Sequence, residues 1–258
     1  MHGLVRCHNI ADLRHLARER LPGPVADYLD GGADDEIALR RNRTAFEAVG
    51  LVPRYGVDVE RVDCATTVLG QRVSMPLALA PAALHKVFHP DGELGVARAA
   101  VDAGAMQFLS AMASTALEDV AATGAGPRCF QVYPRRDRAG MRDLLQRVRA
   151  AGYPAICISI DVPAGDIRAR DRTAGGAMPP RSPPPGWLAL AMHPRWTAGM
   201  LRSGRIGMPN MFADRTRTVT NADVTFDPGV TWRDLEWLVS EWNGPAAIKG
   251  VLCVDDAR

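Results

Sequence analysis

The sequence predicts an α/β fold, a (β/α)8 TIM barrel represented by its first five strands. Three short apolar runs, at residues 129–133, 156–161 and 246–249, each end in polar residues. Short apolar runs of this kind are typical of buried parallel strands. Polar residues at the carboxyl ends of such strands are where α/β barrels build their active sites. Because the chain ends at Arg258, soon after the last run, we expect the barrel to be truncated after about the fifth strand.

The first fifty residues predict a helical segment that precedes the sheet. Residues 9–22 place apolar side chains at helical spacing. A second helix is expected over 23–30, where a pair of glycines follows and supplies the left-handed turn that stops a helix. A third helix is expected over 34–49, because its first residues are acidic and suit the positive end of the helix dipole.

From residue 75 onward, the pattern changes to strands that alternate with helices. We expect strands at 75–80, 106–110, 128–133, 155–161 and 246–252. We expect helices at 91–103, 115–122, 138–151 and 232–242. This alternation is typical of right-handed βαβ units and a parallel sheet. The predicted organisation is a single domain over 1–258, with an N-terminal helical segment at 1–50, five βα units over 75–258 and an insertion-like loop at 174–231.

Five strands could also complete an open doubly wound sheet, so the strand count does not choose between the two folds. The loop after the first strand does. It reads Ala80-Pro81-Ala82-Ala83, with none of the glycines of a dinucleotide-binding or phosphate-binding loop. This loop favours the barrel.

Composition excludes several kinds of partner. The 31 basic and 29 acidic residues are mixed along the chain and leave a net charge of +2, so no basic stripe predicts nucleic acid or lipid binding. The cysteines form no CxxC pair, and no stretch approaches the ~18 apolar residues that span a bilayer. We therefore expect a cytoplasmic protein. His85 and His89 are four residues apart but have no third ligand nearby in the sequence, so no metal site is expected.

A series of short motifs then identifies a family. In chain order they are Asp27–Glu36, Asn42–Phe46, Ser74–Pro76, Ala80–Ala83, His89–Glu93, Phe130–Tyr133, Asp161–Pro163 and Ile248–Val251. In these motifs the chain resembles the FMN-dependent L-2-hydroxy-acid dehydrogenases and oxidases, which include glycolate oxidase, lactate oxidase, mandelate dehydrogenase and flavocytochrome b2. The resemblance runs from about residue 9 to Arg258. It implies a barrel of the FMN-linked oxidoreductase type, with FMN at the carboxyl ends of the strands.

The resemblance also implies which residues bind the FMN cofactor. They are Pro81, Ala82, Ala83, Ser110, Gln131, Tyr133, Ser159 and Lys249. The first three belong to a loop whose backbone contacts the flavin ring, and the polar side chains that follow hydrogen-bond its edge. Such side chains suit a ring that offers fixed donors and acceptors in an otherwise apolar slot. Taken one at a time, each could equally satisfy a local backbone group.

Lys249 is the most informative single residue, because a lysine in an apolar strand is costly to bury without an anionic partner. The resemblance places it beside the N1/O2 edge of the flavin, where it stabilises the negative charge that appears on reduction. The alternative is a lysine at a strand end that reaches solvent.

Tyr28, Tyr133, Asp161 and Lys249 are the catalytic residues that the resemblance implies. The two tyrosine hydroxyls bind the substrate, and Arg168 matches a mobile arginine that also binds it. Asp161 matches the carboxylate that orients the catalytic histidine and raises its pKa. Considered alone, Tyr28 would be a helix-end aromatic residue, Asp161 a turn residue before a proline, and Arg168 part of a charged surface.

The chain departs from the family in one important respect. In the family, the catalytic histidine and an arginine that binds the substrate carboxylate lie in a Ser-Asn-His-Gly-Gly-Arg-like motif after the sixth strand. None of the six histidines here lies in such a motif. We expect the motif to lie beyond Arg258 and the chain alone to be inactive. The alternative is a non-catalytic remnant or scaffold of the same barrel.

The implied reaction is FMN-dependent oxidation of an L-2-hydroxy acid to the 2-oxo acid by hydride transfer to flavin N5. Lactate-, glycolate- and mandelate-like acids are the expected substrates. Ala82 and Ala111-Met112 differ from the residues usual at these places in the family, so the substrate pocket is expected to differ too. The expected partners are the acid itself, an electron acceptor such as oxygen or a quinone, and further copies of the chain in a homo-oligomer of the complete enzyme.

Overall fold

The computed structural model describes residues 7–161, 191–203, 206–212 and 227–258. The chain divides into two compact units. The helical unit comprises residues 1–62 and 166–204, and the sheet unit comprises residues 63–165 and 205–258. Most of the expected loop at 174–231 lies outside the described residues, but its described part contains a helix, α9 (Pro194–Ser203), that the sequence did not predict.

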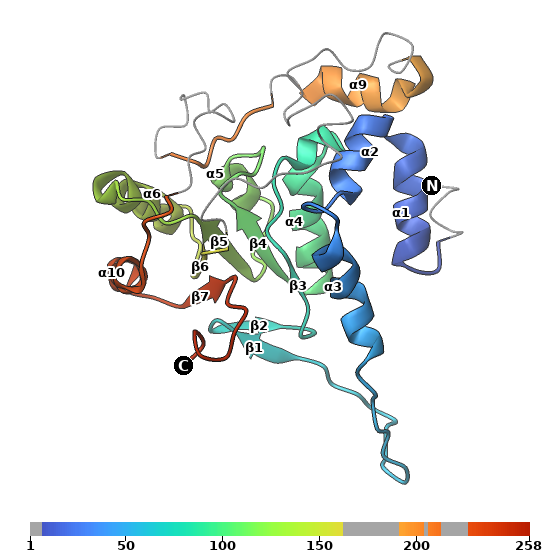
Figure 1. The fold of residues 1–258 in the computed structure, drawn as a ribbon, viewed down its shortest axis with the longest axis horizontal. Coiled ribbons are helices and arrows are strands. Elements are labelled where there is room, and N and C mark those ends of the chain that lie inside the picture. Colours follow the sequence, from blue (N-terminus) through green and yellow to red (C-terminus); the bar gives the residue numbers. More distant parts are fainter. Residues whose placement is uncertain (1–6, 162–190, 204–205, 213–226) are drawn as a thin grey trace. The chain divides into compact units, whose positions relative to one another are not determined.

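Five parallel strands form the centre of the sheet unit (Figure 1). In spatial order they are β3 (Ala78–Leu79), β4 (Met106–Ser110), β5 (Arg128–Val132), β6 (Ile156–Ser159) and β7 (Ala246–Lys249). The connecting elements are η2 (His85–Val87), α4 (Gly92–Ala103), α5 (Leu117–Ala121), α6 (Arg138–Ala150) and α10 (Trp232–Trp242). Strand order therefore follows chain order, as in one continuous arc of a (β/α)8 barrel.

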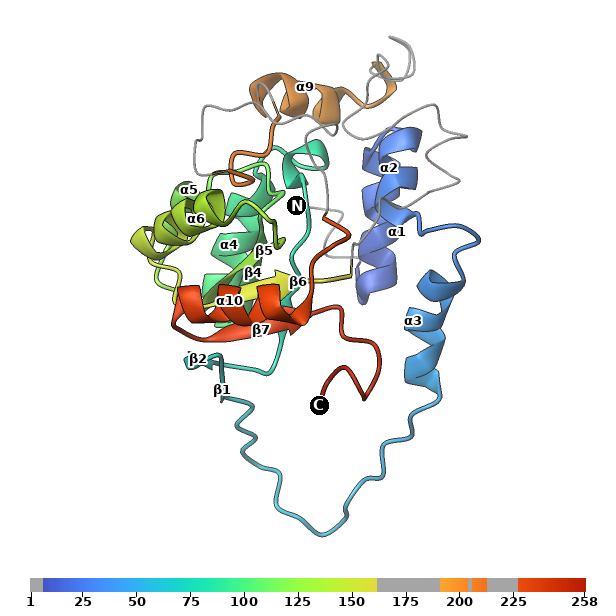
Figure 2. The same cartoon turned by 60° about the vertical axis from the view of Figure 1, so that its left-hand side comes forward.

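The two faces of the sheet carry different side chains. Phe130, Ile156 and Ile158 are fully buried and alternate with the residues of the other face. They belong to the face covered by helices, and α5 and α6 lie along this side of the strands in both ribbon views (Figure 2). On the opposite face, Cys129, Ala155 and Cys157 form a small apolar cluster with Leu69, Phe108 and Ala247. This second face corresponds to the inside of a barrel.

A two-stranded hairpin, which the sequence did not predict, packs against this inner face. It pairs β1 (Thr66–Val68) with β2 (Gln71–Val73) in antiparallel register. The two turn residues, Leu69 and Gly70, have φ of 48° and 74°, as a two-residue type I′ turn requires. The Gln71 amide donates to the Arg128 carbonyl at 3.0 Å and accepts from the Arg128 N–H at 2.8 Å, which fixes the hairpin to the start of β5.

The helical unit contains α1 (Ile10–Arg20), α2 (Gly23–Asp30) and α3 (Ile37–Glu47) in addition to α9. Asn9 caps α1, because its side chain accepts from the Asp12 N–H at 2.9 Å. Asp30 joins α2 to α1 by accepting from Arg14 at 2.7 Å and from Arg18 at 2.5 Å. No helix in the described part of the chain is both long and apolar enough to cross a membrane.

The helices and four of the five strands expected from the sequence are confirmed within a few residues. The first strand is the exception, because β3 covers only residues 78–79 of the expected 75–80. Pro76 has no N–H to donate, and the Leu77 N–H bonds to the Met75 carbonyl at 2.7 Å in a tight turn. The last strand stops at Lys249 because Gly250 adopts a φ of 107°.

Candidate functional site

Three buried polar side chains form a row at the carboxyl ends of neighbouring strands. Ser110, Gln131 and Ser159 lie at or near the ends of β4, β5 and β6, and each is at most 3% exposed. The Ser110 hydroxyl donates to Gln131 Oε1 at 3.1 Å, and Gln131 Nε2 donates to Ser159 Oγ at 3.0 Å. The parallel register brings these residues together, since Ser110 pairs with Gln131 in the ladder of β4 and β5.

The direction of these hydrogen bonds follows from the backbone next to Ser110. The Met112 N–H donates to Ser110 Oγ at 3.0 Å, and the Ala111 N–H donates to Gln131 Oε1 at 3.4 Å. Gln131 therefore presents its oxygen to β4 and its amide nitrogen to β6. The second Nε2 proton of Gln131 and the hydroxyl proton of Ser159 are not used within this row. The row thus offers donors suited to the carbonyl oxygens or ring nitrogens of a bound heterocycle.

An ion pair lies beside the row, on β7 and the residue that follows β6. Lys249 Nζ is 2.5 Å from Asp161 Oδ2, and the two side chains are 42% and 32% exposed. The Ile160 N–H donates to the Lys249 carbonyl at 3.0 Å, so the β6–β7 ladder holds both residues in register. The family resemblance placed Lys249 beside the flavin and Asp161 beside a histidine. It did not predict that the two would pair with each other.

The charges of this pair shift the pKa of the Cys157 thiol. Cys157 lies on the inner face of the sheet and is 3% exposed. Burial raises the pKa of Cys157 to about 11, the Lys249 charge lowers it, and the Asp161 charge raises it. Cys157 is therefore a protonated, apolar part of the wall below the ion pair at neutral pH.

Gly250 is a residue whose role the sequence analysis missed. Its φ is 107°, and a Cβ added there would lie 2.6 Å from the Asp161 Cβ and 3.0 Å from the Asp161 backbone nitrogen. A glycine at this position lets the chain after β7 approach Asp161 closely. The only available sequence signal was the glycine directly after the predicted site lysine.

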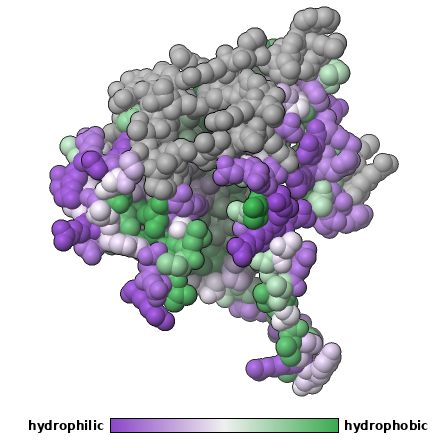
Figure 3. Space-filling model, in the orientation of Figure 1, coloured by the Kyte–Doolittle hydropathy of each residue, from purple (hydrophilic) through white to green (hydrophobic). Residues whose placement is uncertain are grey.

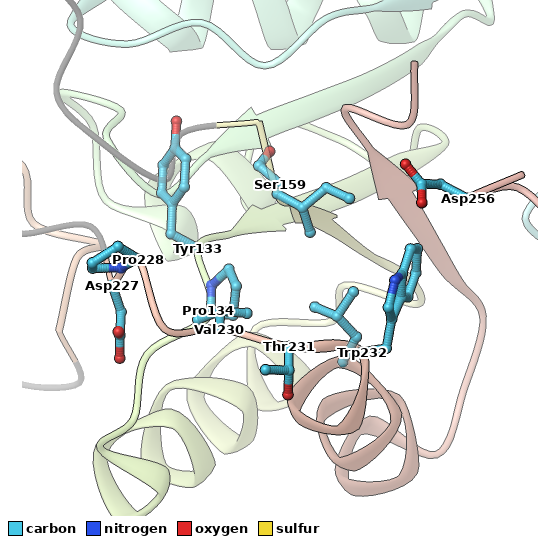
Figure 4. Close-up of a pocket in the computed structure, with 11 residues that line it drawn as sticks. Tyr133, Pro134, Ser159, Asp227, Pro228, Val230, Thr231, Trp232 and Asp256 are labelled. Carbon is cyan, nitrogen blue, oxygen red and sulfur yellow. The ribbon is translucent and has the colours of Figure 1, made fainter. Parts of the chain in front are cut away.

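A pocket of about 250 Å³ lies next to the row in the sheet unit. Its lining includes Tyr133 and Ser159 from the carboxyl ends of β5 and β6, and Thr231 and Trp232 at the start of α10. In Figure 4 the hydroxyl groups of Tyr133 and Ser159 both point away from α10. The structure thus brings Tyr133 to the same end of the sheet as the polar row.

The loop between β3 and η2 contains Pro81, Ala82 and Ala83, of which Ala82 is exposed and the other two are half-buried. The next residue, Leu84, adopts a left-handed φ of 54°, and its N–H donates to the Met112 carbonyl at 3.2 Å. This bond ties the loop to the segment that follows Ser110. The expected flavin-contacting loop therefore lies beside the polar row.

Two further predicted residues do not belong to the described part of the sheet unit. Tyr28 is part of α2 in the helical unit, and Arg168 lies outside the described residues. Both assignments stay predictions, as do the roles assigned to the site residues of the sheet unit. Within the described ranges, no group of three or more His, Cys, Asp or Glu side chains is arranged to hold a metal ion.

Known proteins resemble this chain in sequence and in fold. Residues 17–258 match the family model of the FMN-dependent dehydrogenases. The chain belongs to this family. Its cofactor is FMN, and its members are oxidoreductases. The family resemblance inferred from the sequence motifs is confirmed.

Curated relatives include glycolate oxidase 1 from Oryza sativa subsp. indica, which is 35% identical over 97% of this chain and 64% of its own length. The putative L-lactate dehydrogenase of Mycobacterium tuberculosis is 36% identical over 96% of the chain and 60% of its own length. The 4-hydroxymandelate oxidase of Amycolatopsis orientalis is 38% identical over 97% and 65%. The chain thus spans somewhat less than two thirds of the length of these relatives.

Solved structures agree with the fold. The monotopic membrane protein (S)-mandelate dehydrogenase is 31% identical and superposes with a TM-score of 0.86 over 98% of this chain and 68% of its own. A structure of mandelate oxidase is 36% identical with a TM-score of 0.75. The predicted fold class, a TIM barrel represented by its first five strands, is confirmed by this match and by the five-stranded parallel sheet. The donors of the polar row are of the kind that FMN, with its carbonyl oxygens and ring nitrogens, requires.

Proposed function

We propose that this chain forms the FMN-binding part of an enzyme that oxidises an L-2-hydroxy acid to the 2-oxo acid. The observation that carries the proposal is the polar row Ser110–Gln131–Ser159 next to the Lys249–Asp161 pair. Donors and a cation gathered at the carboxyl ends of parallel strands suit an electron-accepting ring that gains negative charge. Bound FMN would accept a hydride from the substrate carbon.

In this proposal, each group of the chain has a separate task. Gln131 and Ser159 bind the polar edge of the ring, and Ser110 holds the Gln131 amide in its orientation. Lys249 places a positive charge at the same edge, and Tyr133 contacts the ring and offers a hydroxyl to the substrate. Tyr28 and Arg168 are proposed to bind the substrate as well.

Asp161 is proposed to orient a histidine base, as the family resemblance implies. None of the histidines of this sequence lies in the expected motif. We therefore propose that these 258 residues bind FMN and do not remove the substrate proton themselves. The choice among lactate-, glycolate- and mandelate-like acids, the electron acceptor, the single-domain organisation, the homo-oligomer and the cytoplasmic location stay predictions.

Titration of the purified chain with FMN, followed by flavin fluorescence, tests the binding role. Replacing Gln131 by Leu removes two hydrogen bonds of the row and is expected to weaken FMN binding about tenfold. Gln107→Leu is the matched control, because Gln107 is also a buried glutamine of the sheet but belongs to the alternate, helix-covered face. Equal FMN affinity of the Gln131 and Gln107 variants would contradict the proposed site.

Adding L-lactate or L-mandelate to the FMN-loaded chain tests the catalytic role. We expect the flavin absorbance to stay unchanged, since the proposed base is not supplied by these residues. Bleaching of the flavin would show that another residue of the chain acts as the base. A chain that binds no FMN at all would favour the alternative, a scaffold of the same barrel.

A further inference from the structure

Glu93 is a buried carboxylate for which the proposed function gives no role. It lies in the first turn of α4, within the His89–Glu93 motif, and is 1% exposed. No described cation forms an ion pair with it. A buried carboxylate without a cation needs several hydrogen-bond donors to offset the loss of hydration.

The donors to Glu93 come from two loops. Oε1 accepts from the His85 N–H at 3.1 Å, where the loop after β3 enters η2. Oε1 also accepts from the Ser114 N–H at 2.8 Å, and Oε2 accepts from the Thr115 hydroxyl at 2.6 Å. The Ser114 hydroxyl lies within 2.9 Å of both oxygens. One side chain therefore ties the loop of residues 80–87 to the loop of residues 111–116.

Two further bonds support the same connection. The Lys86 N–H donates to Ser114 Oγ at 3.0 Å, and the Leu84 N–H donates to the Met112 carbonyl at 3.2 Å. The Ser114 hydroxyl thus accepts from one loop while it donates to the carboxylate. Without Glu93, the His85 and Ser114 N–H groups would lose their partner, and the Ser114 hydroxyl would be free to turn.

The carboxylate is the ionised form that these donors require. Burial by itself raises the pKa of Glu93, but the hydrogen bonds from Thr115 and Ser114 outweigh burial, so the pKa lies below the ordinary glutamate value. Glu93 is therefore charged at neutral pH and is bound to neutral donors.

We infer that Glu93 is a positioning residue of the FMN site, which holds the Pro81–Ala83 loop beside Ser110 through its bonds to both loops. This inference rests on the proposed function, because it assumes that FMN binds between these loops and the polar row. A side chain that fixes the loops in the binding geometry raises the fraction of molecules that can bind. Releasing the loops lowers the apparent affinity in proportion to that fraction.

Two variants separate the geometry of Glu93 from its charge. Glu93→Ala removes every bond to the loops and is expected to weaken FMN binding about tenfold or more. Glu93→Gln keeps an oxygen for the two N–H groups, while its amide nitrogen can donate to the Ser114 and Thr115 hydroxyls after they rotate. We expect it to stay within about threefold of the wild-type affinity.

Three readouts are compared: the Kd for FMN, the visible circular dichroism of the bound flavin, and hydrogen exchange of the His85 and Ser114 amides. Leu144→Ala is the control for a general loss of stability, because Leu144 is a buried residue of α6, a helix that supplies none of the hydrogen bonds to Glu93. We expect faster exchange and an altered flavin spectrum in Glu93→Ala, with rescue in Glu93→Gln and wild-type FMN binding in Leu144→Ala.

The outcomes distinguish this inference from the proposed function. If the wild-type chain binds FMN and Glu93→Ala binds it equally well, the inference is wrong and the proposed function stands. If Leu144→Ala loses as much affinity as Glu93→Ala, loss of stability explains the effect and the inference is also wrong. If the wild-type chain binds no FMN, both fail, although the exchange experiment would still show whether Glu93 holds the loops.

Discussion

The sheet unit buries its apolar side chains, whereas the helical unit leaves many of its own in solvent. In β5 and β6, eight of nine residues are buried. In α1 and α3 no residue is buried, and Phe46 of α3 is 82% exposed. Figure 3 shows apolar side chains along the segment that follows α3, where Leu51 and Val52 are each 91% exposed. The sheet unit is stabilised mainly by packing, whereas α1 in the helical unit is stabilised by the Asn9 cap and by ion pairs to Asp30 of α2.

The largest expected effect is the loss of a buried side chain from the sheet unit. Phe130→Ala removes a fully buried ring whose centroid lies 5.7 Å from that of the Tyr153 ring in a T-shaped pair, and we expect a loss of about 3–5 kcal/mol in unfolding free energy. The matched change in the helical unit, Phe46→Ala, should alter stability by less than about 0.5 kcal/mol. Hydrogen exchange in urea measures both effects, at the β4–β6 amides for Phe130→Ala and at the α3 amides for Phe46→Ala. Similar losses for the two variants would mean that Phe46 is packed in solution.

A second, smaller effect is expected at Gly250 of the sheet unit, where the backbone passes close to Asp161 of the ion pair. Gly250→Ala adds a Cβ that must displace Asp161 from Lys249, and we expect a loss of about 1–3 kcal/mol. Gly152→Ala is the matched control, because Gly152 also has a positive φ of 82° but no atom within 4 Å of the added Cβ. The difference between the two variants, measured by urea unfolding, isolates the contact with Asp161. Equal losses would assign the whole effect to the backbone angle.

The smallest effect is expected at the ion pairs of the helical unit. Asp30→Asn weakens the bonds to Arg14 and Arg18, whose side chains are 45% and 44% exposed, so we expect a loss of at most about 1 kcal/mol. The loss should shrink at high salt, because the two arginine side chains are exposed to ions, although the Asp30 side chain itself is 8% exposed. Glu19→Gln, which alters the exposed contact with His15, is the control and should have no measurable effect. A loss at Asp30 that does not depend on salt would indicate a packing role.

The two kinds of structure also differ in how far the sequence could predict them. The strands β4, β5 and β6 were predicted within two residues at each end, because their apolar runs are continuous and bounded by turns. The β1–β2 hairpin was missed, since its strands have three residues each and its turn is Leu-Gly rather than Asn-Gly. The helix α9 was missed because it lies in a segment rich in proline and glycine.

The grouping of polar side chains at the strand ends was predictable from the sequence, whereas their individual contacts were not. Ser110 ends a predicted strand, and Gln131 and Ser159 lie two residues before the ends of the predicted strands 128–133 and 155–161, so a parallel sheet brings all three to the same end. The pairing of Lys249 with Asp161 depends on the register of β6 and β7. The hydrogen bonds of Glu93 depend on the paths of two loops. No local pattern in the sequence specifies either.

The separation of Asp161 and Lys249 has a consequence for the synthesis of the chain. The two residues are 88 positions apart, and β6 cannot pair with β7 until Lys249 has left the ribosome. At translation rates of about 5–20 residues per second, the apolar edge of β6 waits roughly 4–18 seconds for its neighbour. An unpaired apolar strand edge is a template for association with other chains. The nascent protein therefore depends on shielding of this edge during synthesis more than a protein built from short hairpins would.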